Sequence, residues 1–338
     1  ACGSPGGGCQ FLGTAATAMT RTLGQRKFPV DRLVPLDVEA MAGSVVLYNG
    51  KEVVVAIAAP GAFEGVDIAL FSAGADASLV LAPVAVREGA IVVDNSSAWR
   101  MDPKVPLVVP EVNPEALDGH AGLIANPNCS TIQMLVAAKP IHDAYTIKRI
   151  VVSTYQAVSG SGGPAIAELT DQARAFVAGD PIKHAVYPRQ ILFNALPHID
   201  VFQDNGYTKE EMKMVHETHK ILDPAILVCP TAVRVGVYRG HSESINLETE
   251  KPLSASAVRA LLGKAPGVIV MDDPAKLVYP TALDCDGRDA VYVGRIREDP
   301  TVPHGINLWV VSDNLRKGAA LNAVQIAETL VQRGLVGR

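Results

Sequence analysis

Short apolar runs alternate with connections rich in glycine and alanine between residues 45 and 130. Several of these runs are apolar without interruption, which is typical of strands buried on both faces of a sheet. Residues 75–88 lie between two of the runs and predict a crossover helix. Such a crossover indicates a parallel, doubly wound α/β sheet. The predicted strands are residues 45–48, 53–57, 66–71, 90–94, 106–109 and 123–125.

Asn49-Gly50 separates the first two of these runs and predicts a tight hairpin turn. Asparagine and glycine accept the positive φ angles that a two-residue hairpin turn needs. The two flanking strands are therefore expected to pair antiparallel.

The pattern changes after residue 130, where longer strands and helices replace the short alternating runs. Residues 147–155 and 225–237 predict strands, the second one interrupted by Pro230. Residues 180–208 contain Pro181, Pro188 and Pro197 and predict a long irregular connection. Long mixed strands with helices indicate an α+β second domain. The predicted helices are residues 131–139, 168–177, 209–222 and 317–333.

Composition narrows the class of protein. The chain has 338 residues, 48% of them hydrophobic and 19% charged, with a net charge of −5. This apolar fraction is enough for a large core, and the length predicts two domains. There is no lysine- or arginine-rich run, so neither nucleic acid nor a membrane surface is an expected partner. No apolar run is long enough to span a bilayer. The expected partner is a small molecule.

The five cysteines are widely spaced along the chain. Their spacing is neither a disulfide framework nor a metal-binding knuckle, so we expect no metal site. The N-terminal residues lack the basic and apolar regions of a signal peptide. We therefore expect a cytoplasmic protein in which any special cysteine is catalytic. The cysteines are Cys2, Cys9, Cys129, Cys229 and Cys285.

Cys129 stands in Asn126-Pro127-Asn128-Cys129-Ser130, where a predicted strand ends and a helix begins. A helix N-terminus carries a partial positive charge and free N–H groups, which lower the pKa of a thiol. The carboxyl ends of parallel strands are also where α/β enzymes place their active sites. Cys129 is therefore a candidate nucleophile, and the alternative is a buried core cysteine.

Arg234 and His241 could serve such a nucleophile as an anion clamp and a proton-transfer group. They are seven residues apart, so on an uninterrupted strand they would face opposite sides. A turn at Arg239-Gly240 could bring them into one pocket. A histidine in such a place can equally be a satisfied core or surface residue, so the spacing leaves the question open.

Three further segments contain candidate binding residues. The glycine-rich loop 156–163 follows a predicted strand and suits a phosphate or a nicotinamide amide, but it can also be a plain connection. Arg100 follows another strand and is either an anion binder or an ordinary solvated arginine. Glu217 and Lys220 lie three apart on one helix face, a spacing that usually makes only a surface salt bridge.

The order of these motifs resembles that of the aspartate-semialdehyde dehydrogenases. The resemblance covers about residues 21–335, with supporting stretches at 94–100 and 108–113. It implies a Rossmann-type NADP-binding domain, an α+β catalytic and dimerisation domain of the glyceraldehyde-3-phosphate dehydrogenase type, and a homodimer. The implied domains are residues 1–129 completed by the C-terminal helix 313–338, and residues 130–312. The motifs are residues 126–129, 155–162 and 317–322, together with Arg234 and His241.

The resemblance also implies a reaction, the reversible NADP-dependent conversion of 4-phospho-L-aspartate to L-aspartate 4-semialdehyde and phosphate through a cysteine acyl-thioester. This step serves diaminopimelate, lysine, threonine and methionine biosynthesis. The resemblance implies that Cys129 is the nucleophile and that His241 is the general acid/base. The implied substrate binders are Gln156, Glu217 and Arg234, and the implied phosphate binders are Arg100 and Lys220. The implied NADP positions are Leu12, Gly13, Thr14, Ala15, Ala40, Met41, Ser159, Gly160 and Asn322.

The N-terminal segment departs from the family pattern. The three glycine positions of the family's cofactor turn fall on Gln10, Gly13 and Ala16, so Gly13 alone is a glycine. Ala40 stands where the family often has an arginine for the 2′-phosphate. Bulkier residues in a turn that approaches a pyrophosphate predict weaker NADP binding.

Two alternative functions fit part of the same pattern. One is another phosphorylating aldehyde dehydrogenase of this fold, such as an N-acetyl-glutamyl-phosphate reductase. Glu217 argues against it, because an acetylated substrate offers no ammonium group for this carboxylate. The other alternative is a catalytically weak dimeric binding protein, which would have no use for Cys129 and His241.

Overall fold

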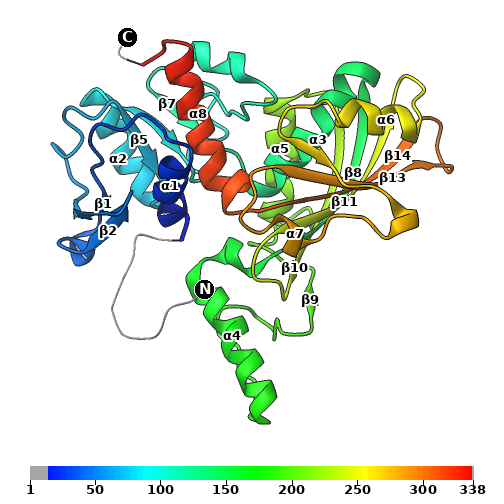
Figure 1. Cartoon of the computed structure of the whole chain (residues 1–338), viewed down its shortest axis with the longest axis horizontal. Coiled ribbons are helices and arrows are strands. Elements are labelled where there is room, and N and C mark those ends of the chain that lie inside the picture. The colour runs from blue at the N-terminus through cyan, green and yellow to red at the C-terminus, as the bar shows by residue number, and fades with distance from the viewer. Residues whose placement is uncertain (1–13, 337–338) are drawn as a thin grey trace.

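A computed structural model describes residues 14–336 of the chain and contains two main sheet regions (Figure 1). The N-terminal region contains the parallel strands β5 (Ile68–Phe71), β6 (Ile91–Asp94) and β7 (Leu123–Ala125), in that order. Helix α2 (Ala75–Arg87) connects β5 to β6. The expected crossover helix and parallel sheet are therefore confirmed.

Helices cover both faces of this sheet. Ala82 of α2 packs against Val92 on one face. Helices α1 (Thr14–Gln25) and α8 (Leu321–Gln332) cover the other face, on the side of Val93. Figure 1 shows α8, drawn in red, beside α1 and β5. The last long helix of the chain therefore returns to the N-terminal region.

The strands β2 (Val45–Tyr48) and β3 (Lys51–Val54) form the expected antiparallel hairpin. Asn49 and Gly50 turn the chain with φ angles of 49° and 78°, so this prediction is confirmed. The expected extension of the second strand to residue 57 is wrong, because the residues after β3 pair with a different segment. Residues 56–57 form the separate strand β4 (Ala56–Ile57), which pairs in parallel with β1 (Leu36–Asp37).

The prediction of a strand over residues 106–109 is also wrong. This segment makes only an isolated bridge, between Leu107 and Ala125. The side-chain amide of Asn113 accepts the N–H of Val109 and donates to the carbonyl of Leu107, each at 2.9 Å. A local side chain thus takes backbone groups that a longer strand ladder would use.

The C-terminal region is built on a seven-stranded mixed sheet in the order β12-β13-β14-β11-β8-β10-β9. The central strand β8 pairs in parallel with β10 and antiparallel with β11. The end of β8, the end of β10 and the start of β11 therefore lie side by side at one edge of the sheet. The strands are β8 (Ile147–Gln156), β9 (Ala195–Leu196), β10 (Leu227–Val235), β11 (His241–Thr249), β12 (Val268–Val270), β13 (Val291–Asp299) and β14 (Gly305–Ser312).

Helices cover one face of this sheet, and the predicted helices and strands of this region are present. Residues 180–208 form an irregular connection that contains only β9, as expected. Pro230 lies where β10 is an edge strand, since β9 pairs only with Arg234 and Val235. No helix among the described residues is long and apolar enough to cross a membrane. The helices on this face are α3 (Cys129–Tyr145), α5 (Lys209–Ile221) and α6 (Ala255–Leu262). Helix α4 (Gly163–Ala178) packs against the irregular connection instead, and α7 (Ala282–Cys285) lies next to β14.

Candidate active site

A cavity of about 1090 Å³ is lined by residues from both sheet regions. Its walls include the loops that follow β5 and β6, at Ser72 and Asn95, and the end of β8 at Gln156. Cys129 and Arg234 line the same cavity. Ligand pockets measure roughly 300–1,000 Å³, so this cavity is large enough for a large ligand.

Cys129 is the first residue of α3, and two contacts fix its position. The side chain of Asn128 caps the helix, with Oδ1 accepting the N–H groups of Ser130 at 3.0 Å and Thr131 at 3.4 Å. Gly318 lies in the π-helical turn before α8 and approaches the cysteine closely. A Cβ atom at Gly318 would lie 2.7 Å from Cys129 Cβ, so only glycine fits there.

Burial raises the pKa of the Cys129 thiol to about 12. The negative charge of Glu210 acts in the same direction, whereas the positive charges of Arg234 and Arg100 oppose it more weakly. The helix N-terminus was expected to lower this pKa, and burial outweighs that effect. At neutral pH and without substrate the thiol is protonated, and its proton must leave when the sulfur attacks.

Arg234 and His241 come from the two strands that flank β8; Arg234 lines the cavity, whereas His241 is completely buried behind it and does not. Arg234 lies opposite Gln156 in the register of β10, and His241 begins β11 after the turn at Gly240, where φ is 87°. A Cβ atom at Gly160 would lie 3.0 Å from Arg234 Nη1 and 3.4 Å from His241 Nε2. The structure thus brings together the two residues whose relation the spacing left open.

The buried ring of His241 is neutral. Its Nδ1 accepts the N–H of Ala157 at 3.1 Å, which places the ring proton on Nε2. Burial and the charge of Arg234 hold the pKa of His241 well below its usual range. Nε2 has no hydrogen-bond partner among residues 14–336. His241 is therefore arranged in this state to donate a proton or a hydrogen bond.

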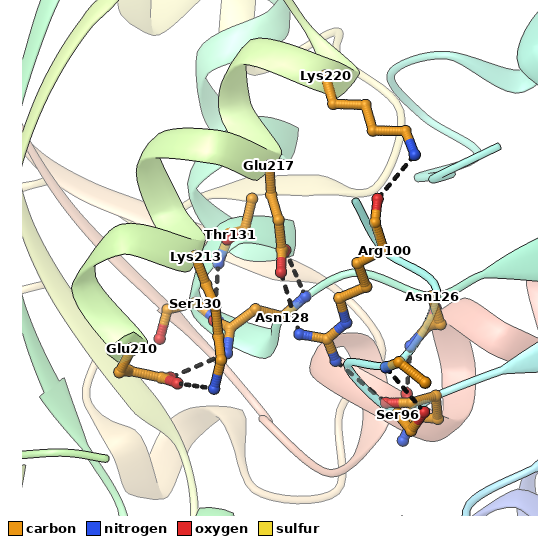
Figure 2. A network of polar contacts seen from close by, with 12 residues as sticks. Ser96, Arg100, Asn126, Asn128, Ser130, Thr131, Glu210, Lys213, Glu217 and Lys220 are labelled. Carbon is orange, nitrogen blue, oxygen red and sulfur yellow. Dashed lines mark hydrogen bonds and ion pairs between the residues drawn. The ribbon is translucent and has the colours of Figure 1, made fainter. Parts of the chain in front are cut away.

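Two buried guanidinium groups line the cavity. Arg100 donates to Glu217 Oε1 and to the carbonyl of Asn95, both at 3.1 Å (Figure 2). Arg234 donates to the carbonyl of Ala157 at 2.7 Å. The Nε of each arginine has no partner within the described part of the chain. Both groups therefore keep the capacity to bind an anion.

Glu217 and Lys220 do not form the surface salt bridge that their spacing predicts. Glu217 is buried and accepts the backbone N–H of Asn128 at 2.7 Å in addition to Arg100. Lys220 donates to three backbone carbonyls at 2.7 to 2.8 Å, the first of which belongs to Arg100, as Figure 2 shows. Neither side chain lines the cavity. Together they hold the Arg100 loop against α5 and the start of α3.

Several charged residues that line the cavity were not expected from the sequence, and three of them, Asp200, Glu210 and Lys213, form one cluster. Lys213 Nζ lies 2.8 Å from a carboxylate oxygen of Asp200 and 3.0 Å from one of Glu210. Glu210 also accepts the side-chain N–H of Asn128 at 2.9 Å. Along the sequence Glu210 is only an acidic residue in the first turn of a helix, which needs no further explanation.

The expected cofactor residues lie in different surroundings. Ser159 and Gly160 line the cavity, and Ser159 Oγ bonds the side chain of Asn314. Thr14 and Ala15 begin α1, which lines the cavity further along at Ala18. Ala40 and Met41 lie in a short 3₁₀ helix after β1 and do not line the cavity. Leu12 and Gly13 lie outside the described residues.

Asn322 is completely buried and does not line the cavity. Its Nδ2 donates to Asn126 Oδ1 at 2.7 Å and to the carbonyl of Val108 at 3.0 Å, and its Oδ1 accepts from Lys317 Nζ at 2.8 Å. The Lys317 ammonium also pairs with Glu111 at 2.6 Å. This buried network holds the segment that leads into Cys129.

Over residues 14–336, no group of three or more histidine, cysteine, aspartate or glutamate side chains is placed to hold a metal ion.

Known proteins resemble this chain over nearly its full length. Residues 12–120 match the family described as "Semialdehyde dehydrogenase, NAD binding domain", and residues 138–317 match "Semialdehyde dehydrogenase, dimerisation domain". The aspartate-semialdehyde dehydrogenase of Aquifex aeolicus is 54% identical over 96% of this chain and 97% of its own. That of Bacillus subtilis is 50% identical over 96% of each chain.

Solved structures agree with these relatives. Aspartate semialdehyde dehydrogenase II of Vibrio cholerae, solved in complex with ASA, has a TM-score of 0.92 and 49% identity over 95% of this chain and 96% of its own. The Candida albicans enzyme, solved with NADP, has a TM-score of 0.73 and 25% identity over 95% and 97%. On sequence and structure alike, the chain belongs to the aspartate-semialdehyde dehydrogenase family.

Proposed function

We propose that this chain catalyses the reversible, NADPH-dependent conversion of 4-phospho-L-aspartate to L-aspartate 4-semialdehyde and phosphate. The observation that carries this proposal is Cys129 at the start of α3, in one cavity with the buried guanidinium groups of Arg100 and Arg234. A thiol can take up the acyl group, and the two guanidinium groups match the phosphate and the α-carboxylate of this substrate. Relatives about half identical over nearly the whole chain carry the name of this enzyme.

In the reducing direction, Cys129 Sγ attacks the acyl carbon of 4-phospho-L-aspartate. The bond between this carbon and the phosphate oxygen breaks, the acyl group stays on sulfur as a thioester, and the thiol proton leaves with the phosphate. Arg234 grips the α-carboxylate, because a planar fork holds a carboxylate at two points. Arg100 binds the phosphate, and Lys220 supports it by holding the Arg100 loop.

His241 assists at the carbonyl oxygen. Its Nε2–H is directed by the bond that Ala157 makes to Nδ1, and it donates a hydrogen bond that stabilises negative charge on that oxygen. Gln156 lines the cavity and holds the substrate beside Cys129. Glu217, the predicted partner of the substrate ammonium, does not line the cavity, and it acts on the substrate through Arg100 and the Asn128 backbone that it holds.

The residues around the cavity fit NADP. Its walls extend from α1 and the carboxyl ends of β5 and β6 to Cys129, and three glycines at 160, 162 and 163 leave room for a bulky ligand. When bound, NADPH supplies the hydride that reduces the acyl group to the aldehyde. Ser159 and Gly160 would hold its nicotinamide end, and Asn322 acts through Asn126. Leu12, Gly13, Thr14, Ala15, Ala40 and Met41 remain the predicted positions for the rest of NADP.

The assembly and setting follow from the same proposal. The chain acts as a homodimer in lysine, threonine and methionine biosynthesis, and residues 130–312 form the catalytic and dimerisation domain. One face of the seven-stranded sheet exposes Tyr155, which contacts Trp309 with ring centroids 5.7 Å apart. Aromatic side chains on an open sheet face suit a protein interface. The free cysteines Cys129, Cys229 and Cys285 fit the reducing cytoplasm.

The test is the oxidative reaction with purified protein. Aspartate semialdehyde, phosphate and NADP should give a rise in absorbance as NADPH forms, and omission of phosphate should stop it. N-acetyl-glutamate semialdehyde should give no rise, because its acetylated nitrogen carries no ammonium for a carboxylate to pair with. Turnover of the acetylated aldehyde alone would replace the proposed substrate.

Arg234→Lys is expected to raise KM for aspartate semialdehyde by about 10-fold or more, the value of roughly one charge-assisted hydrogen bond. Lysine keeps the charge but cannot grip the carboxylate at two points. Steady-state kinetics measures this change, and KM for phosphate serves as the internal control because Arg100 is untouched. An unchanged KM for the aldehyde would remove Arg234 from the carboxylate site.

Gly318→Ala is expected to lower kcat by about 100-fold, because a displacement near 1 Å of a reacting group has an effect of this size. The new Cβ would lie 2.7 Å from Cys129 Cβ, so the cysteine must move. Gly119→Ala is the matched control, since a Cβ there meets no atom within 4 Å and the φ angle is permissive. Equal kcat values for both variants and the unmodified chain would show that the turn before α8 does not position the thiol.

A further inference from the structure

Asp37 is the last residue of β1, the strand that follows α1 in the NAD-binding domain. Strand β1 pairs in parallel with β4, and Asp37 lies opposite Ile57 at the carboxyl end of the pair. In a Rossmann-type domain the glycine turn leads into the first helix, and the strand after that helix ends beside the ribose of the adenosine half of the cofactor. Asp37 holds this place in the chain.

The spacing along the sequence agrees with this assignment. In such domains an acidic residue about 20 residues after the glycine turn accepts a hydrogen bond from the ribose 2′-hydroxyl of NAD, whereas a nearby arginine accommodates the 2′-phosphate of NADP. Asp37 follows Ala16, the last of the three turn positions, by 21 residues. The chain therefore has the acidic residue of an NAD site at the position where that residue is expected.

The Asp37 carboxylate is available to a ligand. Its Oδ1 accepts the N–H of Val38 at 2.7 Å, and its Oδ2 has no partner among residues 14–336. The neighbouring Val38 and Ile57 are apolar but 62% and 45% exposed. A free carboxylate oxygen beside an exposed apolar surface suits an adenosine, whose ribose donates hydroxyl groups and whose ring is flat and largely apolar.

The same segment offers no partner to a 2′-phosphate. Strand β1, the 3₁₀ helix Glu39–Met41 and strand β4 contain no lysine and no arginine. Ala40 stands where the family often has an arginine for this phosphate. A phosphate is bound best by charge-assisted N–H donors, and the charges of Asp37 and Glu39 would repel it. This end of the sheet therefore favours a cofactor that has a free 2′-hydroxyl.

We propose that Asp37 is a specificity-determining residue that binds the ribose 2′-hydroxyl of the cofactor, so that this chain binds NADH at least as tightly as NADPH. This inference rests on the proposed function, because it concerns the cofactor of that reaction. It leaves the chemistry at Cys129 unchanged, since NADH and NADPH share the nicotinamide that supplies the hydride and differ only at the distant ribose.

The test titrates the full-length protein with NADH and, separately, with NADPH, following the fluorescence of the bound nucleotide. We expect NADH to bind at least as tightly as NADPH. Asp37→Ala should weaken NADH binding by about 10-fold, the value of a hydrogen bond to a charged group. It should tighten NADPH binding, because a negative charge near the 2′-phosphate is removed. The ratio of the two dissociation constants should therefore change by more than about 10-fold.

A second variant tests the same position from the other side. Ala40→Arg adds a guanidinium group where the 2′-phosphate needs one, so it should tighten NADPH binding by about 10-fold and affect NADH far less. Asp31→Ala is the matched control. Asp31 is an exposed aspartate in the connection between α1 and β1, so its loss should leave both dissociation constants unchanged.

The outcomes separate this inference from the proposed reaction. Tighter binding of NADPH than of NADH to the unmodified chain, or an unchanged ratio in Asp37→Ala, would overturn the role of Asp37 and leave the reaction standing. Binding of neither nucleotide would overturn both. The titration needs no aldehyde substrate, so it tests Asp37 even if aspartate semialdehyde is not turned over.

Discussion

Cys129→Ala is expected to abolish turnover while the chain folds as before. The variant lacks the sulfur that takes up the acyl group, and no other residue can form the thioester. Alanine is a good helix former and keeps the Cβ that packs against Gly318, so α3 should begin at the same place. Steady-state kinetics with aspartate semialdehyde, phosphate and NADP measures the loss, and thermal unfolding checks the fold.

Cys229→Ala is the control for this variant. Cys229 is exposed on β10 and does not line the cavity, so its replacement should leave the rate unchanged. A Cys129→Ala enzyme that kept a rate within about tenfold of the unmodified chain would remove the thiol from the mechanism, since loss of a covalent nucleophile has far larger effects.

His241→Asn is expected to lower kcat by about 100-fold or more, the usual contribution of a positioned proton donor. Asparagine can accept the N–H of Ala157 but cannot place a donor where Nε2–H lies. The change should fall on kcat, because the unpartnered Nε2–H is used only as charge develops on the carbonyl oxygen.

The pH dependence gives a second check on His241. Its pKa is lowered, so the ring stays neutral as pH falls through the ordinary histidine range and gains a charge only below it. The unmodified enzyme should therefore show no histidine-dependent loss of kcat near pH 6.5, the ordinary histidine pKa. His304→Asn is the control. His304 forms a hydrogen bond with the carbonyl of Glu250, so its replacement should leave kcat and its pH dependence unchanged. If His241→Asn changed KM and left kcat unaltered, His241 would be a binding residue.

Local patterns predicted the elements of the fold well. Residues 75–88 and Asn49-Gly50 specify a helix and a turn by chemistry that needs no distant partner, and both are present. The segment 106–109 failed because Asn113, outside it, takes its backbone groups. The site is harder to predict for the same reason. Arg234 and His241 meet only because their strands flank β8 on opposite sides.

The electrostatics of the site depended on residues that the sequence places far apart. The position of Cys129 at a helix start predicts a lowered pKa, but burial and Glu210, 81 positions away in sequence, raise it. Glu217 and Lys220 have the spacing of a surface pair, yet each is used by the Arg100 loop. Spacing describes a helix face, and only the folded chain determines what that face meets.

The close approach of Gly318 to Cys129 has a consequence for how the protein is made. The turn before α8 and the Asn322 amide support the segment that carries the nucleophile, although they are synthesised long after it. The seven-stranded sheet is complete in sequence by Ser312 and can form earlier. We therefore expect that in a nascent chain the helix of Cys129 takes its final position only after this later segment has left the ribosome.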